Sequence, residues 1–427
     1  MKILIISNIF PPGFIGGYEL GAYDVATSFQ QQGHQVRVLT SDYLLDEKQE
    51  IVNFKVDRIL EWIEVDPRQD WNSIVYKGQF INIRNIRLLN NVLNDFQPDS
   101  VVCFNLLGLG VLGILHYLVS LNFKPICYLM FNLFYLIYAE NKKLFCQYNE
   151  KFGLIEEFLQ KVRFISMSEC LTVDIQKALG FILQDIHLIP GWYLEHTLPS
   201  SLLTNDINAD SYLNDSVKFI FASRISEPKG IFIVLEAVKI IIEKYNLTNF
   251  SVDIYGAGEI TLFLQKVAIQ KLDKWICYCG SEKKEQICKL FAKYDALLFP
   301  TWGNEPFGFV VAEAAAAKCV PIITATIGAA EWFMDGLDCY KIQRNPESLA
   351  RAMIDYLKKN NQERNTIKLY ARKTALKYFK FSHLFKKITK LTEQVSIKEN
   401  SSFYKDKGQE MAMTILEDLW SKGDDLI

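Results

Sequence analysis

The feature that most constrains the fold of this chain is a regular alternation of short apolar runs and longer segments with helical periodicity. Short apolar runs bounded by turn residues are typical of buried strands, and strands that alternate with helices favour a doubly wound parallel sheet. In the first half of the chain the strand candidates are residues 2–6, 35–39, 100–104, 125–130, 163–166 and 186–189. Helices are predicted over residues 20–31, 80–95 and 109–120.

The same alternation starts again after a polar segment. Residues 190–215 contain prolines, serines, asparagines and aspartates without periodicity, which indicates a connection between domains. The second series has strand candidates at residues 218–222, 251–255, 275–278, 296–299 and 320–323. We therefore predict an α/β protein with two Rossmann-like domains, residues 1–195 and 216–375, and a linker at 196–215. In the polar tail, residues 396–427, one short helix is predicted near residues 411–420.

Composition narrows the function classes. At 427 residues the chain is long enough for two or three domains, and its formal net charge of −2 indicates neither a nucleic acid nor an acidic polymer as partner. The N-terminus runs directly into a strand-like segment and lacks the apolar core and cleavage site of a signal peptide. We therefore expect a cytoplasmic protein.

The nine cysteines are scattered along the chain without a C-x-x-C pair. Cys277 and Cys279 alternate along a predicted strand and have no histidine near them, so the sequence indicates neither a zinc site nor a disulfide framework. Reduced cysteines are the expectation for a cytosolic protein.

Residues 100–123 carry no formal charge and are long enough to resemble a membrane-spanning helix in a hydropathy profile. Against that interpretation, the segment begins as a strand-like run, is interrupted by Asn105, and then contains three glycines and His116. A buried strand, a turn and a core-facing helix give the same average hydropathy, and we favour this interpretation.

The most informative motif is Glu305-Pro-Phe-Gly-Phe-Val-Val-Ala-Glu313, which follows the strand candidate 296–299. Pro306 suits the first position of a helix, and residues 312–317 continue it with good helix formers. Glu305 is then expected at the C-terminal end of a strand, where open α/β sheets bind ligands. A helix start suits a phosphate and two carboxylates suit hydroxyls, a combination that a nucleotide sugar needs. The alternative is that Glu305 caps the helix and Glu313 is solvated.

The pattern E-P-F-G-x-x-x-x-E-A resembles the retaining glycosyltransferases of family 4, which have the GT-B architecture. The resemblance covers about residues 1–390 and is most specific at 217–345. It implies two domains that face a central cleft, the first on the acceptor side and the second on the side of the nucleotide-sugar donor. It also implies that a C-terminal helix, residues 376–395, crosses back to the first domain.

The resemblance also implies roles for the residues of the motif. Glu305 would orient the transferred sugar through its hydroxyls, and Glu313 would bind the ribose hydroxyls. Phe307, Gly308 and Phe309 would offer backbone N–H groups to the donor.

Two cations flank a predicted turn between a strand and a helix, in Ser223-Arg224-Ile-Ser-Glu-Pro-Lys229-Gly230. Arg supplies a forked contact and Lys a point charge, which suits a diphosphate, and the family resemblance assigns the departing diphosphate to Arg224 and Lys229. The chain contains no D-x-D sequence, so we expect no metal and no other cofactor. The alternative is that both are ordinary solvated cations beside Glu227.

Three glycine loops are candidates for donor contacts, and those at Gly16-Gly17 and Gly328 resemble loops of the same family. Gly16 and Gly17 follow the first strand candidate, where small residues let backbone N–H groups approach an anion or a sugar. Gly256 opens a G-x-G turn that lacks the third small residue of a dinucleotide fingerprint, which disfavours NAD. Gly328 opens a Gly-Ala-Ala-Glu sequence, in which we interpret Glu331 as mostly structural. Simple tight turns are the alternative for the first two loops.

The chain departs from the family just after residues 125–130, where a donor-contacting histidine is expected. Phe131 occupies that position and Asn132 follows it. Three interpretations stay open. Asn132 supplies the sugar contact in place of the histidine, this branch of the family binds the donor differently, or the activity is impaired. His116, the nearest histidine, is expected to be a packed or surface residue. The aromatic run at residues 131–138 is either core or an apolar wall for the acceptor.

Residues 358–390 contain eleven Lys or Arg and a single acid, Glu363. Most such runs are solvated helix faces, which is our interpretation here. The alternative is a basic amphipathic helix on anionic lipid, which would bring the protein into peripheral contact with the inner face of a membrane.

These observations together predict a metal-independent hexosyltransferase that moves a sugar, with retention, from a nucleoside-diphosphate sugar to a hydroxyl acceptor. A UDP-sugar is favoured and a GDP-sugar is the alternative; the acceptor is a growing polysaccharide, a glycolipid or a small metabolite. No carboxylate is an obvious covalent nucleophile, so departure and attack on the same face are expected. Two other functions stay open, a nucleotide-sugar epimerase and a non-catalytic subunit that binds a nucleotide or a partner enzyme.

Overall fold

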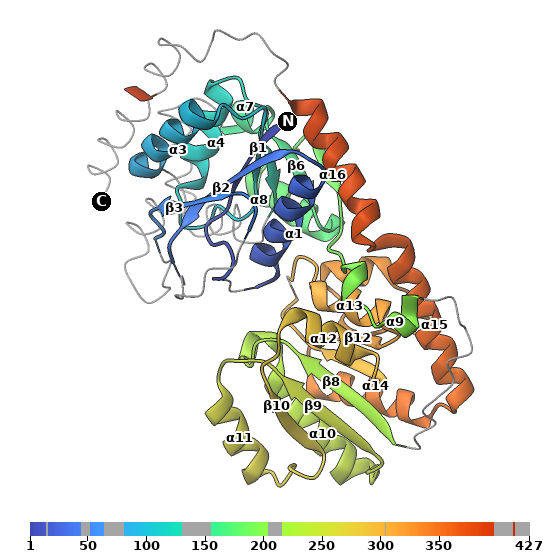
Figure 1. Ribbon diagram of the computed structural model, residues 1–427. Helices are drawn as coiled ribbons and strands as arrows, with labels where there is room; N and C mark the ends of the chain where they lie inside the picture. The colour runs from blue at the N-terminus through green and yellow to red at the C-terminus, as the bar shows by residue number, and fades with distance from the viewer. Residues whose placement is uncertain are drawn as a thin grey trace. The chain divides into compact units, whose positions relative to one another are not determined.

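The computed structural model describes residues 1–13, 16–43, 52–63, 81–129, 155–203, 216–303, 305–396 and 413–414 (Figure 1). The chain forms two compact units. The first comprises the described parts of Met1–Ser166, Leu171–Ile189 and Phe385–Ile427, and the second comprises those of Met167–Cys170 and Pro190–Leu384. Each unit has its own parallel sheet and its own hydrophobic core.

The first unit contains a seven-stranded parallel sheet in the order β3-β2-β1-β4-β5-β6-β7. Its strands are β1 (Lys2–Ile6), β2 (Gln35–Ser41), β3 (Lys55–Leu60), β4 (Ser100–Cys103), β5 (Ile126–Tyr128), β6 (Arg163–Ser166) and β7 (Ile186–Leu188). The helices between them are α1 (Gly17–Gln31), α3 (Ile83–Phe96), α4 (Val111–Ser120), α7 (Ile155–Leu159) and α8 (Glu169–Leu179). Helix α16 (Phe381–Val395) ends the described chain apart from residues 413–414.

The uncharged stretch at residues 100–123 forms strand β4, a turn and the ten-residue helix α4, as the sequence analysis favoured. Every residue of β4 is buried, and the helix presents a largely buried surface to the core. Among the described residues, no helix combines the length and the apolar character that a membrane crossing requires.

The second unit contains a six-stranded parallel sheet in the order β10-β9-β8-β11-β12-β13. Its strands are β8 (Val217–Ala222), β9 (Phe250–Tyr255), β10 (Ile276–Gly280), β11 (Ala296–Phe299), β12 (Val320–Thr324) and β13 (Tyr340–Ile342). The α-helices are α9 (Ser200–Leu203), α10 (Ile231–Tyr245), α11 (Ile260–Ile269), α12 (Lys284–Phe291), α13 (Phe309–Ala316), α14 (Pro346–Lys358) and α15 (Asn361–Tyr378). The described residues of this unit also form three short 3₁₀ helices, η2 (Glu195–Thr197), η3 (Glu227–Lys229) and η4 (Gly328–Trp332).

The strand order creates a point in the second sheet at which the direction of travel reverses. From β8 the chain proceeds to β9 and β10 on one side, whereas from β11 it proceeds to β12 and β13 on the other. Because β8 and β11 are parallel neighbours, the turns that follow them lie side by side at the same edge of the sheet. Open α/β sheets bind their ligands at such a point. The turn after β8 carries Lys229 and the turn after β11 carries Glu305.

Several sequence predictions need correction. Helix α13 begins at Phe309 and not at Pro306, because Gly308 takes a left-handed conformation that interrupts a helical path. Two strands, β3 and β13, were not predicted. Lys55 and Asp57 give β3 a charged pattern, and β13 has only three residues.

Some predictions fall on residues outside the described part of the chain. These are the aromatic run at 131–138 with Asn132, residues 204–215 of the expected linker, and most of the expected helix near 411–420.

Candidate functional site

The carboxylate of Glu305 is the centre of a cluster at the edge of the second sheet. Its Oε2 atom forms an ion pair with Nζ of Lys229 and accepts a hydrogen bond from Nε1 of Trp302 at 2.9 Å. The Thr301 hydroxyl lies 3.4 Å from the same oxygen. Both charged side chains are largely buried, with 17% of Lys229 and 14% of Glu305 exposed. Two residues predicted separately, one for the diphosphate and one for the sugar, therefore contact each other.

The loop that carries Lys229 is fixed by its backbone. The carbonyl of Pro228 accepts a hydrogen bond from the Trp302 backbone at 2.8 Å, which ties the loop to the one after β11. On its other side, Nη2 of Arg344 donates to the carbonyl of Glu227 at 2.7 Å. The ammonium of Lys229 also lies 5.8 Å from the centre of the Phe299 ring. These contacts fix the position of the cation before any ligand binds.

Arg224, the second predicted cation, differs from Lys229 in its surroundings. It is exposed, and among the described residues it has no ion-pair partner within 4.0 Å. The next residue, Ile225, is buried and exchanges backbone hydrogen bonds with Ala257 and Glu259, so the backbone beside Arg224 is well fixed. Arg224 is therefore an accessible cation on an ordered loop, available to an anion from solvent.

Glu313 lies in the second turn of α13 and is only 5% exposed, so it is not the solvated helix residue of the alternative interpretation. Nζ of Lys284, near the start of α12, lies 3.7 Å from its Oε1 atom. A buried carboxylate requires such partners, because an unpaired charge in a protein interior is costly. No sequence pattern pointed to Lys284, which is 29 positions away from Glu313 in the chain.

The start of α13 is shaped by Gly308. Its φ angle of 88° is left-handed, and a Cβ atom there would lie 2.7 Å from the Phe299 ring, so a larger residue would need both strain and a shift. Phe307 is buried against Phe379, and Phe309 packs edge-on against Trp192. These aromatic contacts fix the backbone at the helix start, where the first N–H groups lack partners within the helix.

Gly328 and Glu331 belong to η4, which contacts the same loop. The Gly328 N–H donates to the Glu305 carbonyl at 3.0 Å, and a Cβ atom on Gly328 would lie 1.9 Å from the Pro306 carbonyl. The Glu331 carboxylate accepts hydrogen bonds from the N–H groups of Glu169 at 2.7 Å and Cys170 at 2.6 Å. This contact agrees with the mostly structural role that the sequence analysis gave to Glu331.

The other predicted glycines lie on ordered turns. Gly256 donates its N–H to the carbonyl of Gly280 at 2.9 Å, which joins the ends of β9 and β10. In the first unit, Gly16 precedes α1 and donates its N–H to Oε2 of the buried Glu19 at 2.9 Å, while Gly17 is the first residue of that helix. Among the described residues, no atom other than those of its chain neighbours lies within 4 Å of a Cβ position at Gly16.

His116, the histidine nearest to the expected family position, is a packed residue of α4. Its ring stacks on Phe158 with centroids 4.9 Å apart, and burial lowers the pKa of the imidazole.

Residues 205–374 match the family model of glycosyl transferases group 1. The matched segment contains all of the cluster around Glu305 as well as Glu313 and Arg224. It also includes residues 217–345, the part of the chain in which the family resemblance was most specific.

Related proteins extend the similarity to most of the chain. An uncharacterized glycosyltransferase of Methanocaldococcus jannaschii is 21% identical over 368 residues, which cover 82% of this chain and 87% of the relative. A glycosyltransferase structure from Rickettsia africae has a TM-score of 0.67 at 17% identity, covering 92% of this chain and 98% of the other. Anabaena HepE in complex with UDP and glucose has a TM-score of 0.64 at 16% identity, covering 92% and 100%. The two parallel-sheet units therefore have the GT-B architecture.

Proposed function

We propose that this protein is a retaining glycosyltransferase that moves a hexose from a nucleoside-diphosphate sugar to a hydroxyl acceptor without a catalytic metal. The observation that carries the proposal is the Lys229–Glu305 pair at the reversal point of the second sheet, inside the segment that matches glycosyl transferases group 1. A cation and a carboxylate at this edge suit the two parts of such a donor, its diphosphate and its sugar. UDP is the favoured nucleotide, which the UDP complex of the structurally similar Anabaena protein supports.

In the proposed reaction, the bond between the anomeric carbon and the diphosphate oxygen breaks while the acceptor oxygen bonds to the same carbon on the same face. The diphosphate leaves with the bonding electron pair, and the acceptor proton passes to a phosphate oxygen. Lys229 and Arg224 would stabilise the negative charge that develops on the leaving diphosphate. Because the positions of these two cations are set before the reaction, they need not move during it. Backbone N–H groups of Phe307, Gly308 and Phe309 would add to this stabilisation.

Glu305 and Glu313 would bind different parts of the donor. Glu305 would accept hydrogen bonds from the hydroxyls of the transferred sugar, and Glu313 would accept them from the ribose. Gly256 and Gly328 would line the donor site through their backbone. We also propose donor contacts from Gly16, Gly17 and Asn132. These contacts rest on the family resemblance alone.

A binding screen followed by a turnover assay tests the proposal. The full chain is first heated with UDP, GDP, ADP or TDP, because a ligand that binds only the folded state raises the melting temperature. The stabilising nucleotide is then supplied as its sugar, with and without a mixture of hydroxyl acceptors. We expect stabilisation by UDP and acceptor-dependent release of UDP, with the anomeric configuration retained in the product by NMR.

The other outcomes contradict the proposal in distinguishable ways. A new sugar isomer formed from the donor alone identifies an epimerase. Tight nucleotide binding without release of the nucleoside diphosphate, either to acceptors or to water, identifies a non-catalytic subunit. No stabilisation by any of the four nucleotides contradicts nucleotide-sugar chemistry altogether.

A further inference from the structure

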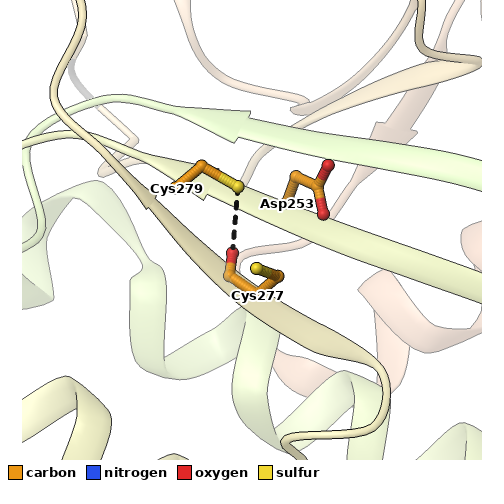
Figure 2. Close-up of side chains that lie close together, drawn as sticks. All are labelled: Asp253, Cys277 and Cys279. Carbon is orange, nitrogen blue, oxygen red and sulfur yellow. Dashed lines mark hydrogen bonds between the residues drawn. The ribbon is translucent and has the colours of Figure 1, made fainter.

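A group of potential metal ligands lies at the β10 edge of the second sheet. It shares no residue with the cluster around Glu305. Cys277 and Cys279 are on β10, which is an edge strand, and Asp253 is on the neighbouring strand β9. The register pairs Cys277 directly with Asp253. The register of β10 against β9 shifts between Tyr278 and Gly280, and at this irregularity the Cys279 thiol lies 3.7 Å from the backbone carbonyl of Cys277 (Figure 2). The fold thus brings two sulfurs and a carboxylate together at the edge of the sheet.

The ligand atoms of these residues are close enough to share one ion. Each residue offers one ligand atom, and the three atoms lie within 4.8 Å of one another (Figure 2). A tetrahedral zinc site requires ligand separations of about 3.8 Å between two sulfurs, given Zn–S bonds of about 2.3 Å. Within the described part of the chain, no other group of three His, Cys, Asp or Glu residues meets this distance condition.

The carboxylate of the group is oriented by a neighbouring hydroxyl. Tyr294 donates a hydrogen bond to Oδ2 of Asp253 at 2.6 Å, and the Tyr255 hydroxyl lies 3.3 Å from that of Tyr294. Outer partners of this kind orient the ligating groups in metal sites and tune their affinity. The carboxylate retains its other oxygen for a cation.

The exposure of the two thiols is a separate observation. Cys277 is exposed and Cys279 is half-buried, although cysteine is among the residues most often buried in proteins. Of the other described cysteines, Cys170 is half-buried and five are fully buried. These five are Cys103, Cys127, Cys288, Cys319 and Cys339. The two thiols next to a carboxylate are thus accessible to an ion from solvent.

We propose that Asp253, Cys277 and Cys279 bind a borderline-soft divalent cation of the zinc class, with water as the fourth ligand. Thiolates favour such cations over magnesium or calcium, and three protein ligands leave one coordination position open. Binding releases the two thiol protons to solvent. The sequence alone did not suggest this site, since the third ligand comes from another strand and is adjacent only through the sheet register.

An occupied site would join β10 to β9 more strongly. Gly256 follows β9 and bonds to the carbonyl of Gly280 at the end of β10, so the ion would strengthen the strand pair that carries this turn. The proposal concerns the ion and its ligands, and it does not depend on the proposed transferase activity.

Titration of the full chain with cadmium, under a phosphine reductant, tests the site. Cadmium is a softer analogue whose bonds to thiolates absorb in the ultraviolet. We expect one strongly bound cadmium per chain, displacement by zinc, and a melting temperature that rises with metal concentration. Cobalt in place of cadmium should give the intense visible absorption of a tetrahedral site.

Matched variants separate the site from adventitious binding. Cys277→Ser, Cys279→Ser and Asp253→Asn should each abolish the strong binding, and Tyr294→Phe should weaken it about 10-fold or more. Cys170→Ser removes a half-buried thiol outside the group and should bind as the unaltered chain does. The absence of strong binding in the unaltered chain overturns the proposal. Unchanged cadmium absorption in the double variant C277S/C279S, shown by circular dichroism to be folded, overturns it equally.

Discussion

Lys229 forms an ion pair with Glu305, although the two residues are 76 positions apart in the sequence. The contact has a consequence for donor binding. A diphosphate that approaches Lys229 competes with Glu305 for the same ammonium group. Donor binding would therefore loosen this ion pair, and it would leave the Glu305 carboxylate with the Trp302 indole and the Thr301 hydroxyl as neighbours. The carboxylate would then be available to the sugar hydroxyls.

Replacement of Lys229 tests this arrangement through both rate and stability. In Lys229→Ala, turnover with saturating donor should fall by about 100- to 1000-fold, because the fixed positive charge that would stabilise the departing diphosphate is lost. The free energy of unfolding should also fall, by about 1–3 kcal/mol, since a largely buried carboxylate loses its ionic partner. Steady-state kinetics and urea unfolding measure the two effects.

Arg224→Ala is the matched comparison for Lys229→Ala. Because Arg224 is exposed, its loss should lower turnover while changing stability by no more than about 0.5 kcal/mol. Normal turnover in Lys229→Ala would exclude this lysine from catalysis, whatever its effect on stability.

Chelation tests the expectation that transfer needs no metal. The proposed clamp for the diphosphate consists of two cations and a helix start, so activity should persist in excess EDTA. An ion at Asp253, Cys277 and Cys279 would be removed by the same treatment, which should lower the melting temperature without abolishing turnover. Complete loss of activity, restored only by magnesium or manganese, contradicts the metal-free clamp.

Asp185 should make stability depend on pH. Burial opposes its ionisation, but hydrogen bonds from Lys124 at 2.5 Å, from His187 at 2.7 Å and from Arg163 at 3.1 Å outweigh burial and lower the pKa of the carboxyl from its ordinary value. A carboxyl whose pKa is lowered by folding stabilises the native state above its unfolded pKa. The stabilisation is lost as the pH falls through the lower, folded value.

Urea unfolding of Asp185→Asn at several pH values checks this expectation. The variant should be less stable than the unaltered chain at pH 7, and the difference should shrink below about pH 4. Asp174→Asn, which removes an exposed carboxylate of α8, should change stability by no more than about 0.5 kcal/mol. A deficit in Asp185→Asn that is constant from pH 7 to pH 3 would show that its charge is not the cause.

The basic run at residues 358–390 is partly engaged within the protein. Lys368 pairs with Asp295 at 2.6 Å, and the Arg372 guanidinium donates to the carbonyls of Ala316 and Leu202. Exposed lysines of the run include three on one stretch of α16, namely Lys386, Lys387 and Lys390. These three are the better candidates for a contact with anionic lipid.

Vesicle sedimentation distinguishes lipid contact from a solvated helix face. If α16 meets anionic lipid, the protein should sediment with anionic but not with neutral vesicles, and salt should release it. Replacing the three lysines of α16 by Gln should then abolish sedimentation. The same change at Lys266, Lys271 and Lys274, which are exposed elsewhere, is the control for net charge. Equal behaviour with both vesicle types supports the solvated face that the sequence analysis favoured.

Much of the fold could be predicted because buried parallel strands are short apolar runs whose ends are marked by turn residues. The bounds of β1, β6 and β11 match the predictions for this reason. β3 could not be found in this way, since Asp57 on that strand is stabilised by an ion pair with Arg37 of β2. In the sequence, the charged residues of β3 resemble those of a surface loop. In the structure, a residue of the neighbouring strand pairs with the charge of Asp57.

The candidate site was predictable in its parts and not in its contacts. The positions of Lys229 and Glu305 after strands followed from the local pattern, but their pairing depends on the strand order of the sheet. Lys284 could not have been assigned to Glu313, because only the packing of α12 beside α13 brings them together. The start of α13 was misplaced, since a left-handed glycine overrides the preference of proline for a first helical position.

The roles proposed for Glu305 and Glu313 should be separable by mutation. Glu313, if it binds the ribose, contacts a part of the donor that does not change during the reaction. Glu313→Gln should therefore weaken ground state and transition state alike and raise the donor KM with little change in kcat. Glu305, if it contacts the transferred sugar, whose charge changes, should affect kcat more strongly. Glu305→Gln retains the shape and one hydrogen-bonding oxygen, and it removes the charge together with the ion pair to Lys229.

Calorimetry with bare UDP decides between the two assignments, because UDP contains the ribose and lacks the sugar. Glu313→Gln should bind UDP more weakly, whereas Glu305→Gln should bind it no more weakly than the unaltered chain, because Lys229 loses the carboxylate that competes with the diphosphate. Circular dichroism and the melting temperature control for folding, which matters most for the buried Glu313 and its partner Lys284. If the double variant E313Q/K284M regains stability but not affinity for UDP, the carboxylate acts on the nucleotide and not through the fold. Equal losses of UDP affinity in the two single variants, or losses in the reverse order, would mean that the two carboxylates are assigned wrongly.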